Sequence, residues 1–94
     1  SDVIIEEVCS FYNIENSALR GQGRTKDTAL ARQVAMYLIR SLTNLSLVDI
    51  GNLYEGRNHS TVLNSIRKIE ELLKSDQETA ATVRDISSNI NSRS

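Results

Sequence analysis

The sequence predicts an all-α fold, a compact helical domain of about five helices, and three observations support this class. The 94 residues contain no proline and only four glycines, so little interrupts a helix. Apolar residues recur at helical spacing in each long segment. Aromatic residues make up 4% of the chain, so the core must consist mainly of Leu, Ile, Val and Ala, which suits helices packed on helices. This length allows a single domain over residues 1–94 with one modest core.

The first helix is expected at about residues 2–13, with an apolar stripe formed by Ile4, Val8 and Phe11. A short turn of helix should follow Ser17. A loop around Gly21 and Gly23 then separates it from the next segment, because glycine interrupts regular structure.

The longest helix is expected at about residues 26–42, with Thr25 as a candidate N-cap. Its buried face should contain Ala29, Leu30, Val34, Tyr37, Leu38 and Leu42, with Met36 also in the core. A short helix with the sequence LVDIGNLY should follow. Ser46 is expected to cap it, with Asp49 completing a variant of the capping box.

The last two helices also begin at recognisable caps. Asn58 should cap a helix over about residues 59–74, whose buried residues are Val62, Ile66 and Ile69. Ser75 and Glu78 have the spacing of a capping box and should open a final helix. The buried face of that helix should contain Val83, Ile86 and Ile90.

The net charge of the chain is −1, but its charged residues are unevenly distributed along the sequence. Residues 20–40 carry several basic side chains and a single acidic one, Asp27. Residues 1–19 carry acidic side chains and no basic ones. This division is compatible with one anion-binding face and a solubilising reverse side. Pairing of charges along solvated helices explains the same distribution equally well.

The short helix, a tight turn at Gly56 and the following helix have the layout of a helix-turn-helix. In that motif the start of the second helix enters the major groove of DNA, and its free N–H groups also favour phosphate. Here that start carries consecutive hydrogen-bonding side chains: Arg57, Asn58, His59, Ser60 and Thr61. The spacing alone also fits helical hairpins that bind no DNA, so other partners stay open.

Specific motifs narrow this choice. The chain contains RQVAMYL in the long helix, LTNLSLVDIG around the short one, and GRNHSTV followed by KI in the next, with FYNIENSALRGQGR upstream. Over nearly its whole length it resembles the C-terminal DNA-binding domain (domain IV) of the DnaA family of bacterial replication initiators. That family carries R-Q-x-A-M-Y-L, L-T-x-x-S-L-x-x-I-G, G-R-D-H-T-T-V and a K-I pair in the same order.

The resemblance implies binding to double-stranded DNA at the DnaA boxes of a bacterial replication origin. It assigns major-groove readout to Asn58, His59, Ser60 and Thr61, and contacts with thymine methyl groups to Leu47 and Val48. Arg24 would enter the minor groove. Arg57 would serve a phosphate or the turn itself. The other expected contacts, mainly with the DNA backbone, are Thr25, Arg32, Gln33, Arg40 and Thr43.

Three positions depart from the family pattern. Asn58 stands where the family has Asp and adds a hydrogen-bond donor to an acceptor-only position. Ser60 replaces Thr and lacks its methyl group, and Val48 replaces Pro and loses the fixed φ. We therefore expect recognition of similar boxes with a shifted preference at one or two positions. Non-specific binding should be weaker, because the loop is less basic.

We expect no catalysis and no cofactor in this chain. It contains no G-x-x-x-x-G-K-[ST] phosphate loop, so ATP would bind an upstream domain of a larger initiator of which residues 1–94 form the C-terminal fragment. With Cys9 and His59 each the only one of its kind, no zinc set or internal disulfide is expected. The sequence also predicts no membrane span and no signal peptide. We expect a cytoplasmic protein, monomeric as an isolated domain and oligomeric on the origin at full length.

Two other interpretations stay open. A stand-alone helix-turn-helix transcription regulator of Trp-repressor-like architecture would need to dimerise, and it predicts an exposed apolar stripe on the first or last helix. A helical adaptor for a protein partner predicts an apolar surface groove. Its binding would depend little on salt, in contrast to binding through phosphate contacts.

Overall fold

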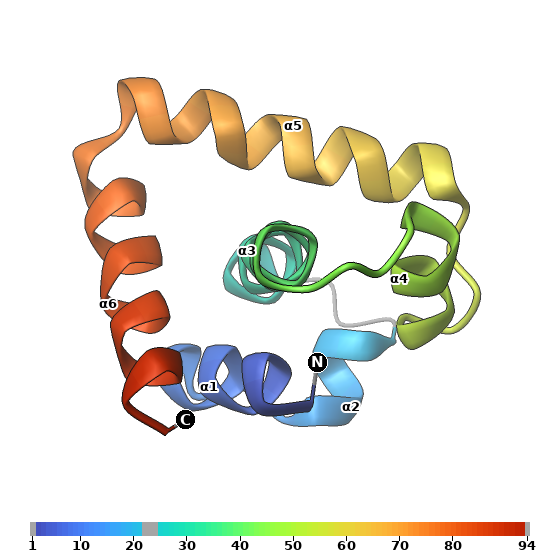
Figure 1. Cartoon of the computed structure of the whole chain (residues 1–94), viewed down its shortest axis with the longest axis horizontal. Helices are drawn as coiled ribbons and strands as arrows, with labels where there is room; N and C mark the ends of the chain where they lie inside the picture. Colours follow the sequence, from blue (N-terminus) through green and yellow to red (C-terminus); the bar gives the residue numbers. More distant parts are fainter. Residues whose placement is uncertain (1, 22–24, 94) are drawn as a thin grey trace.

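The computed structural model describes residues 2–21 and 25–93, and the regular structure within these ranges is entirely helical (Figure 1). The helices are α1 (Asp2–Tyr12), α2 (Asn16–Arg20), α3 (Lys26–Leu42), α4 (Leu47–Leu53), α5 (His59–Ser75) and α6 (Gln77–Arg93). The all-α prediction is therefore confirmed. The described part of the chain has one helix more than the five expected, because the turn predicted near Ser17 is the short helix α2. None of the helices in these ranges is both long and apolar enough to cross a membrane.

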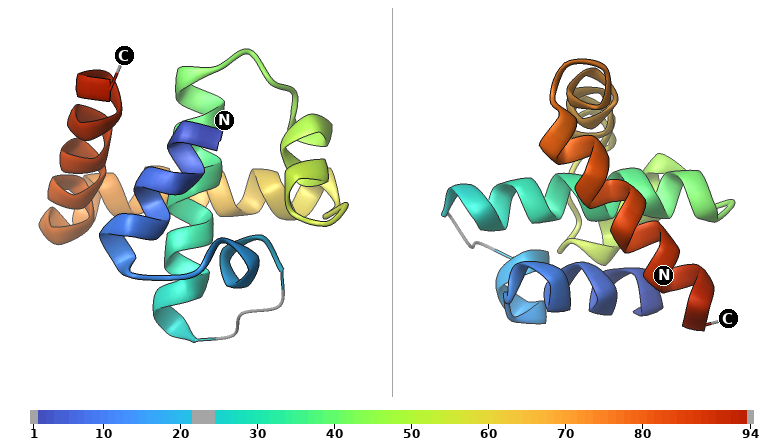
Figure 2. Two further views of the ribbon diagram at one scale, coloured as in Figure 1. Left: turned by 90° about the horizontal axis from the view of Figure 1, so that it is seen from below. Right: turned by 90° about the vertical axis from the view of Figure 1, so that its left-hand side faces the viewer.

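Helix α3 runs through the centre of the domain and contacts each of the other helices (Figure 1, Figure 2). Seen along its axis, α5 lies above it, α1 below it, and α6 and α4 on its two sides (Figure 1). Helix α6 contacts both α5 and α1. Near its end, Arg93 Nη1 donates to Glu7 Oε2 at 2.8 Å, which ties α6 to α1. The central position of α3 explains why it is buried on several sides.

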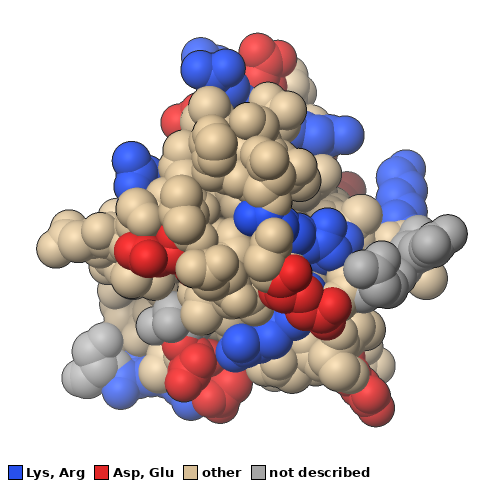
Figure 3. All heavy atoms as spheres, turned by 90° about the vertical axis from the view of Figure 1, so that its right-hand side faces the viewer, with Lys and Arg blue, Asp and Glu red and all other residues tan. Residues whose placement is uncertain are grey.

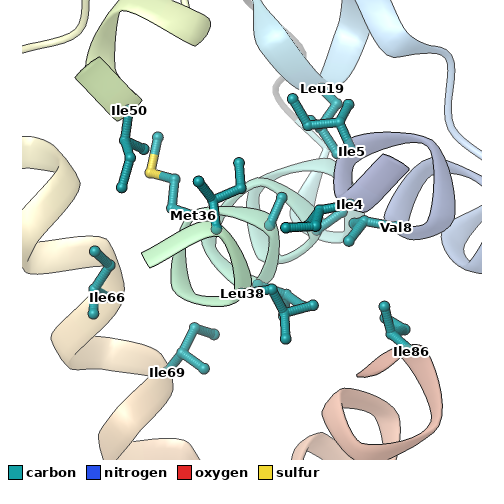
Figure 4. Packing of buried hydrophobic residues seen from close by; sticks show 14 of the residues in the cluster. Ile4, Ile5, Val8, Leu19, Met36, Leu38, Ile50, Ile66, Ile69 and Ile86 are labelled. Atoms are coloured by element: carbon teal, nitrogen blue, oxygen red, sulfur yellow. The ribbon is translucent and has the colours of Figure 1, made fainter. Parts of the chain in front are cut away.

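Aliphatic side chains from all six helices form the core around α3 (Figure 4). The predicted buried residues of the last two helices are confirmed: Val62, Ile66, Ile69, Val83, Ile86 and Ile90. Met36 is also fully buried, as expected, and the single cysteine is a buried free thiol. Tyr54 is the one fully buried aromatic residue among those described, and it follows α4 directly.

Two residues predicted to be buried are exposed, and here the expected register was wrong. Phe11 and Leu42 are each 46% exposed. On α1 the buried face is rotated toward Ile5, which is fully buried, and toward Cys9, so Phe11 lies at the edge of this face. Leu42 is the last residue of α3, where the helix leaves its neighbours. The periodicity of apolar residues shows that a helix has a buried face, but the helices packed against it determine which residues lie at the centre of that face.

The predicted N-caps of α3 and α4 are confirmed. The Thr25 hydroxyl accepts a hydrogen bond from the Thr28 N–H at 3.1 Å. Ser46 Oγ accepts from the Asp49 N–H at 3.1 Å, and the Asp49 carboxylate accepts from the Ser46 N–H at 3.4 Å, which completes the capping box. Both caps satisfy N–H groups that the helix itself leaves without partners.

The capping box predicted for Ser75 and Glu78 is wrong. Ser75 is the last residue of α5, and its hydroxyl donates to the Glu71 carbonyl at 3.2 Å. The chain becomes extended one residue later, so the next helix is capped by Asp76. Its Oδ1 accepts from the Glu78 N–H at 3.2 Å, and its Oδ2 accepts from the Thr79 hydroxyl at 2.7 Å.

Candidate nucleic-acid interface

A tight turn joins α4 to α5. The Gly51 carbonyl accepts from the N–H groups of Tyr54 and Arg57, each at 3.0 Å. A Cβ atom at Gly51 would collide with the Arg57 carbonyl oxygen, so only glycine allows the turn to approach α4 this closely. Glu55 and Gly56 then adopt positive φ values of 61° and 73°. This backbone fixes where α5 starts.

The first turn of α5 separates exposed polar side chains from buried apolar ones. Asn58 Oδ1 accepts from the Ser60 N–H at 2.7 Å, so Asn58 is the predicted N-cap. Residues 59–61 are exposed, whereas Val62 behind them is fully buried. No acidic residue lies in this first turn. Its N–H groups and the positive end of the helix dipole therefore meet no carboxylate of the same turn, which favours an anionic partner.

The start of α4, the first helix of the helix-turn-helix, presents an apolar surface. Val48 is 57% exposed, and Leu47 beside it is half-buried. The capping box at Ser46 holds the backbone of both residues in helical geometry without the proline that the family carries. Val48 therefore keeps an exposed apolar side chain suited to contact with a methyl group.

Arg32 and Arg40, the two arginines expected to contact the DNA backbone, differ in the hydrogen bonds that their N–H groups already make. Arg40 is exposed, and one of its donors, Nη1, bonds to the Leu45 carbonyl at 2.9 Å. Arg32 is half-buried and donates to three carbonyl groups at the end of α2: Leu19 at 2.7 Å, Ala18 at 3.1 Å and Gly21 at 3.1 Å. Burial lowers the pKa of Arg32, and the neighbouring Arg57 cation lowers it further. Arg40 is thus the one better placed to meet phosphate.

Two of the predicted contact residues also serve the ends of α3. The Thr25 hydroxyl donates to the Thr28 hydroxyl at 2.7 Å in addition to capping the helix. The Thr43 hydroxyl donates to the Ile39 carbonyl at 2.6 Å and accepts from the Leu45 N–H at 3.3 Å. These bonds give both threonines a structural role. The predicted minor-groove residue, Arg24, lies outside the described residues.

Gln33 lines a groove between α3, α5 and α6. Lys26 and Lys68 line the same groove, and so do the acidic residues Asp27 and Asp76. No pattern in the sequence groups the two lysines, because they lie on different helices and far apart in the chain. They are additional cationic candidates beside Gln33.

Figure 3 views the side of the domain on which α4 and the start of α5 lie. Basic side chains on this face form separate groups, with uncharged and acidic groups between them (Figure 3). The charge distribution along the sequence fitted an anion-binding face and paired surface charges equally well, and this face has no continuous basic field among the described residues. Uncharged polar side chains must therefore carry much of any recognition here.

The fold and this surface define the class of the protein. A short helix, a glycine-dependent turn and a second helix with an exposed polar start make a helix-turn-helix domain, which is a binding module. The family model described as the bacterial dnaA protein helix-turn-helix matches residues 1–69. The chain therefore belongs to the family of bacterial DnaA helix-turn-helix domains, as its motifs indicated.

Known relatives agree with this assignment. The chain is 45% identical over 83 residues, 88% of its length, to the chromosomal replication initiator protein DnaA of Thermus thermophilus, of which the match covers 19%. It is 42% identical over 82 residues, 87% of its length, to the protein of the same name from Thermomicrobium roseum, of which the match covers 18%. The chain thus spans less than a fifth of the length of these curated relatives.

Proposed function

We propose that this domain binds double-stranded DNA at the DnaA boxes of a bacterial replication origin, with the first turn of α5 in the major groove. One observation carries the proposal. The first turn exposes hydrogen-bonding side chains at residues 59–61, while the same helix packs into the core through Val62 and Ile66. Membership of the DnaA helix-turn-helix family supports DNA as the partner.

The cap at Asn58 limits what this residue can read. Its side-chain oxygen already accepts from the Ser60 N–H, and its amide NH₂ offers a base two donors that an aspartate lacks. Asn58 should therefore bond to acceptors such as guanine O6, adenine N7 or thymine O4. An aspartate at this position would offer acceptors only and would suit cytosine N4 instead. The departure from the family pattern thus predicts a changed base preference at one position.

The remaining residues divide the work between base contacts and positioning. His59, Ser60 and Thr61 would complete the major-groove readout, and Val48 with Leu47 would contact thymine methyl groups. Arg40 would bind phosphate. Arg24 would enter the minor groove, and Thr25, Arg32, Gln33 and Thr43 would lie along the backbone, as the family resemblance implies.

The function can be tested by fluorescence anisotropy with a duplex that carries a DnaA box and a scrambled duplex of equal length. The domain should prefer the box, and its affinity should fall linearly with salt on logarithmic axes. Equal affinity for the two duplexes would contradict sequence-specific binding. Changing Arg40 to Ala should weaken binding to both duplexes alike and reduce the salt slope by about one. Arg84→Ala, on the exposed side of α6, is the matched control.

The length of the relatives supports placing this domain in a larger protein. We infer that it belongs to a larger cytoplasmic initiator whose ATP-binding module lies upstream and which oligomerises on the origin. The isolated domain should be a monomer, and sedimentation without DNA checks this. A dimer would favour a stand-alone regulator of Trp-repressor type instead.

A further inference from the structure

Arg57 directly precedes the N-cap of α5, but its side chain turns inward. Its Nη2 donates to the Gly21 carbonyl, just beyond the end of α2, at 2.5 Å. Its Nε is buried and has no partner among the described residues. Its backbone N–H donates to the Gly51 carbonyl in α4 at 3.0 Å. One residue thus links the end of α2, the middle of α4 and the start of α5.

The surroundings of Arg57 make this link specific. Arg32 donates to the same Gly21 carbonyl at 3.1 Å, so two guanidinium groups from distant parts of the chain converge on one oxygen. Tyr54, the first residue after α4, is fully buried, and its hydroxyl has no hydrogen-bond partner among the described residues. The turn is therefore held against the end of α2 through side chains as well as through its own backbone bonds.

This geometry also argues against a phosphate contact by Arg57. A guanidinium binds phosphate through donors that face solvent, often two at once. Here Nη2 bonds to the Gly21 carbonyl and Nε is buried, so the edge of the guanidinium formed by these two atoms faces the protein. A two-donor contact with phosphate through this edge would break the bond to Gly21.

We propose that Arg57 is a positioning residue that fixes the direction of the first turn of α5, and so sets base discrimination without contacting DNA. The inference rests on the proposed box binding. Hydrogen bonds to base edges require donor–acceptor distances near 3 Å and favourable angles, so a small shift of the turn weakens them. The salt-dependent attraction to phosphate follows the number of neutralised charges and tolerates such a shift.

The test compares Arg57→Ala and Arg57→Lys with the parent and with Arg84→Ala, which removes one exposed positive charge from α6. Lys keeps the charge but lacks the planar fork of donors, and it also covers the case in which the Ala variant does not fold. Circular dichroism establishes that each variant is folded at the temperature of the binding assay. Anisotropy with box and scrambled duplexes over a series of salt concentrations gives the affinity ratio and the salt slope.

A positioning role predicts that the ratio of box to scrambled affinity falls about tenfold in Arg57→Ala, and less in Arg57→Lys, while the salt slope matches that of Arg84→Ala. A slope reduced by about one with the ratio unchanged would identify a phosphate contact and overturn the proposal. A lower melting temperature with ratio and slope both unchanged would leave Arg57 a purely structural role and overturn it as well. Failure of the parent domain to prefer the box would overturn the proposed function itself, before any variant is considered.

Discussion

The two ends of α5 share one buried stripe but present different surfaces. The stripe consists of Val62, Ile66 and Ile69. At the N-terminal end, residues 59–61 are exposed, polar and free of acidic groups. At the C-terminal end the exposed side chains carry both signs of charge: Glu70 and Glu71 lie among Arg67, Lys68 and Lys74. One helix thus carries an end without carboxylates and an end with mixed charges.

This difference shows that a buried packing face and an exposed polar surface are separable within a single helix. The buried stripe determines whether α5 is held in the domain, because removing apolar surface from water stabilises the fold. The exposed first turn contributes little to that stability, so its side chains are available for a partner. Changes to the stripe should therefore alter the free energy of unfolding, and changes to the first turn should alter binding.

The largest expected effect is on stability, from Ile69→Ala. This side chain is fully buried, and its truncation leaves a cavity in the core. The free energy of unfolding should fall by about 2–5 kcal/mol, measured by urea denaturation followed with circular dichroism. Glu70→Ala, one residue further on the exposed side, is the control and should change stability little. If both variants lost stability equally, the division of α5 into two faces would be wrong.

The next effect is on binding, from His59→Ala. The side chain is exposed in the first turn, so the melting temperature should stay close to that of the parent. Affinity for the box should fall by about 1–3 kcal/mol and discrimination should decrease, as anisotropy with both duplexes will show. Asn89→Ala, an exposed polar residue on α6, should leave affinity unchanged. Equal losses for box and scrambled duplexes would move His59 from base readout to backbone contact.

Asn58 sharpens the comparison because it caps α5 and is also a proposed contact with a base. Asn58→Ala removes the cap on Ser60 and should lower the free energy of unfolding by about 1 kcal/mol. Asn58→Asp keeps the cap and adds a charge that the helix dipole favours, so stability should be retained or rise slightly. Binding-site selection on the parent and on Asn58→Asp should then differ at one base position. Identical selected sites would show that Asn58 is a cap alone.

The sequence predicted the parts of the fold that depend on local chemistry. The caps at Thr25, Ser46 and Asn58 were predictable because each side chain bonds to a backbone group two or three residues away. The buried stripe of α5 was predictable because a single helix face meets the core. The family motifs then identified the helix-turn-helix that these elements build.

Features that depend on distant neighbours could not be predicted in this way. Phe11 is exposed because α1 packs with a rotated face, and the sequence of α1 alone does not set that rotation. Ser75 and Asp76 are both good caps, and the end of α5 decided between them. The bonds of Arg32 and Arg57 to the carbonyl groups around Gly21 join segments far apart in the sequence, so no local pattern indicates them.

The smallest expected effect comes from Glu71→Gln, which removes a negative charge from the C-terminal end of α5. Glu71 lies roughly 18 Å along the axis from His59 at about 1.5 Å per residue, more than twice the screening length of about 8 Å at physiological salt. Both the stability change and the affinity change should therefore stay within about 0.5 kcal/mol, measured by denaturation and anisotropy. Thr61→Glu places a charge of the same sign in the first turn, where it meets phosphate directly, and it should weaken binding to every duplex. If Glu71→Gln strengthened binding at physiological salt as much as Thr61→Glu weakened it, DNA would extend along the whole of α5, and its C-terminal end would belong to the interface.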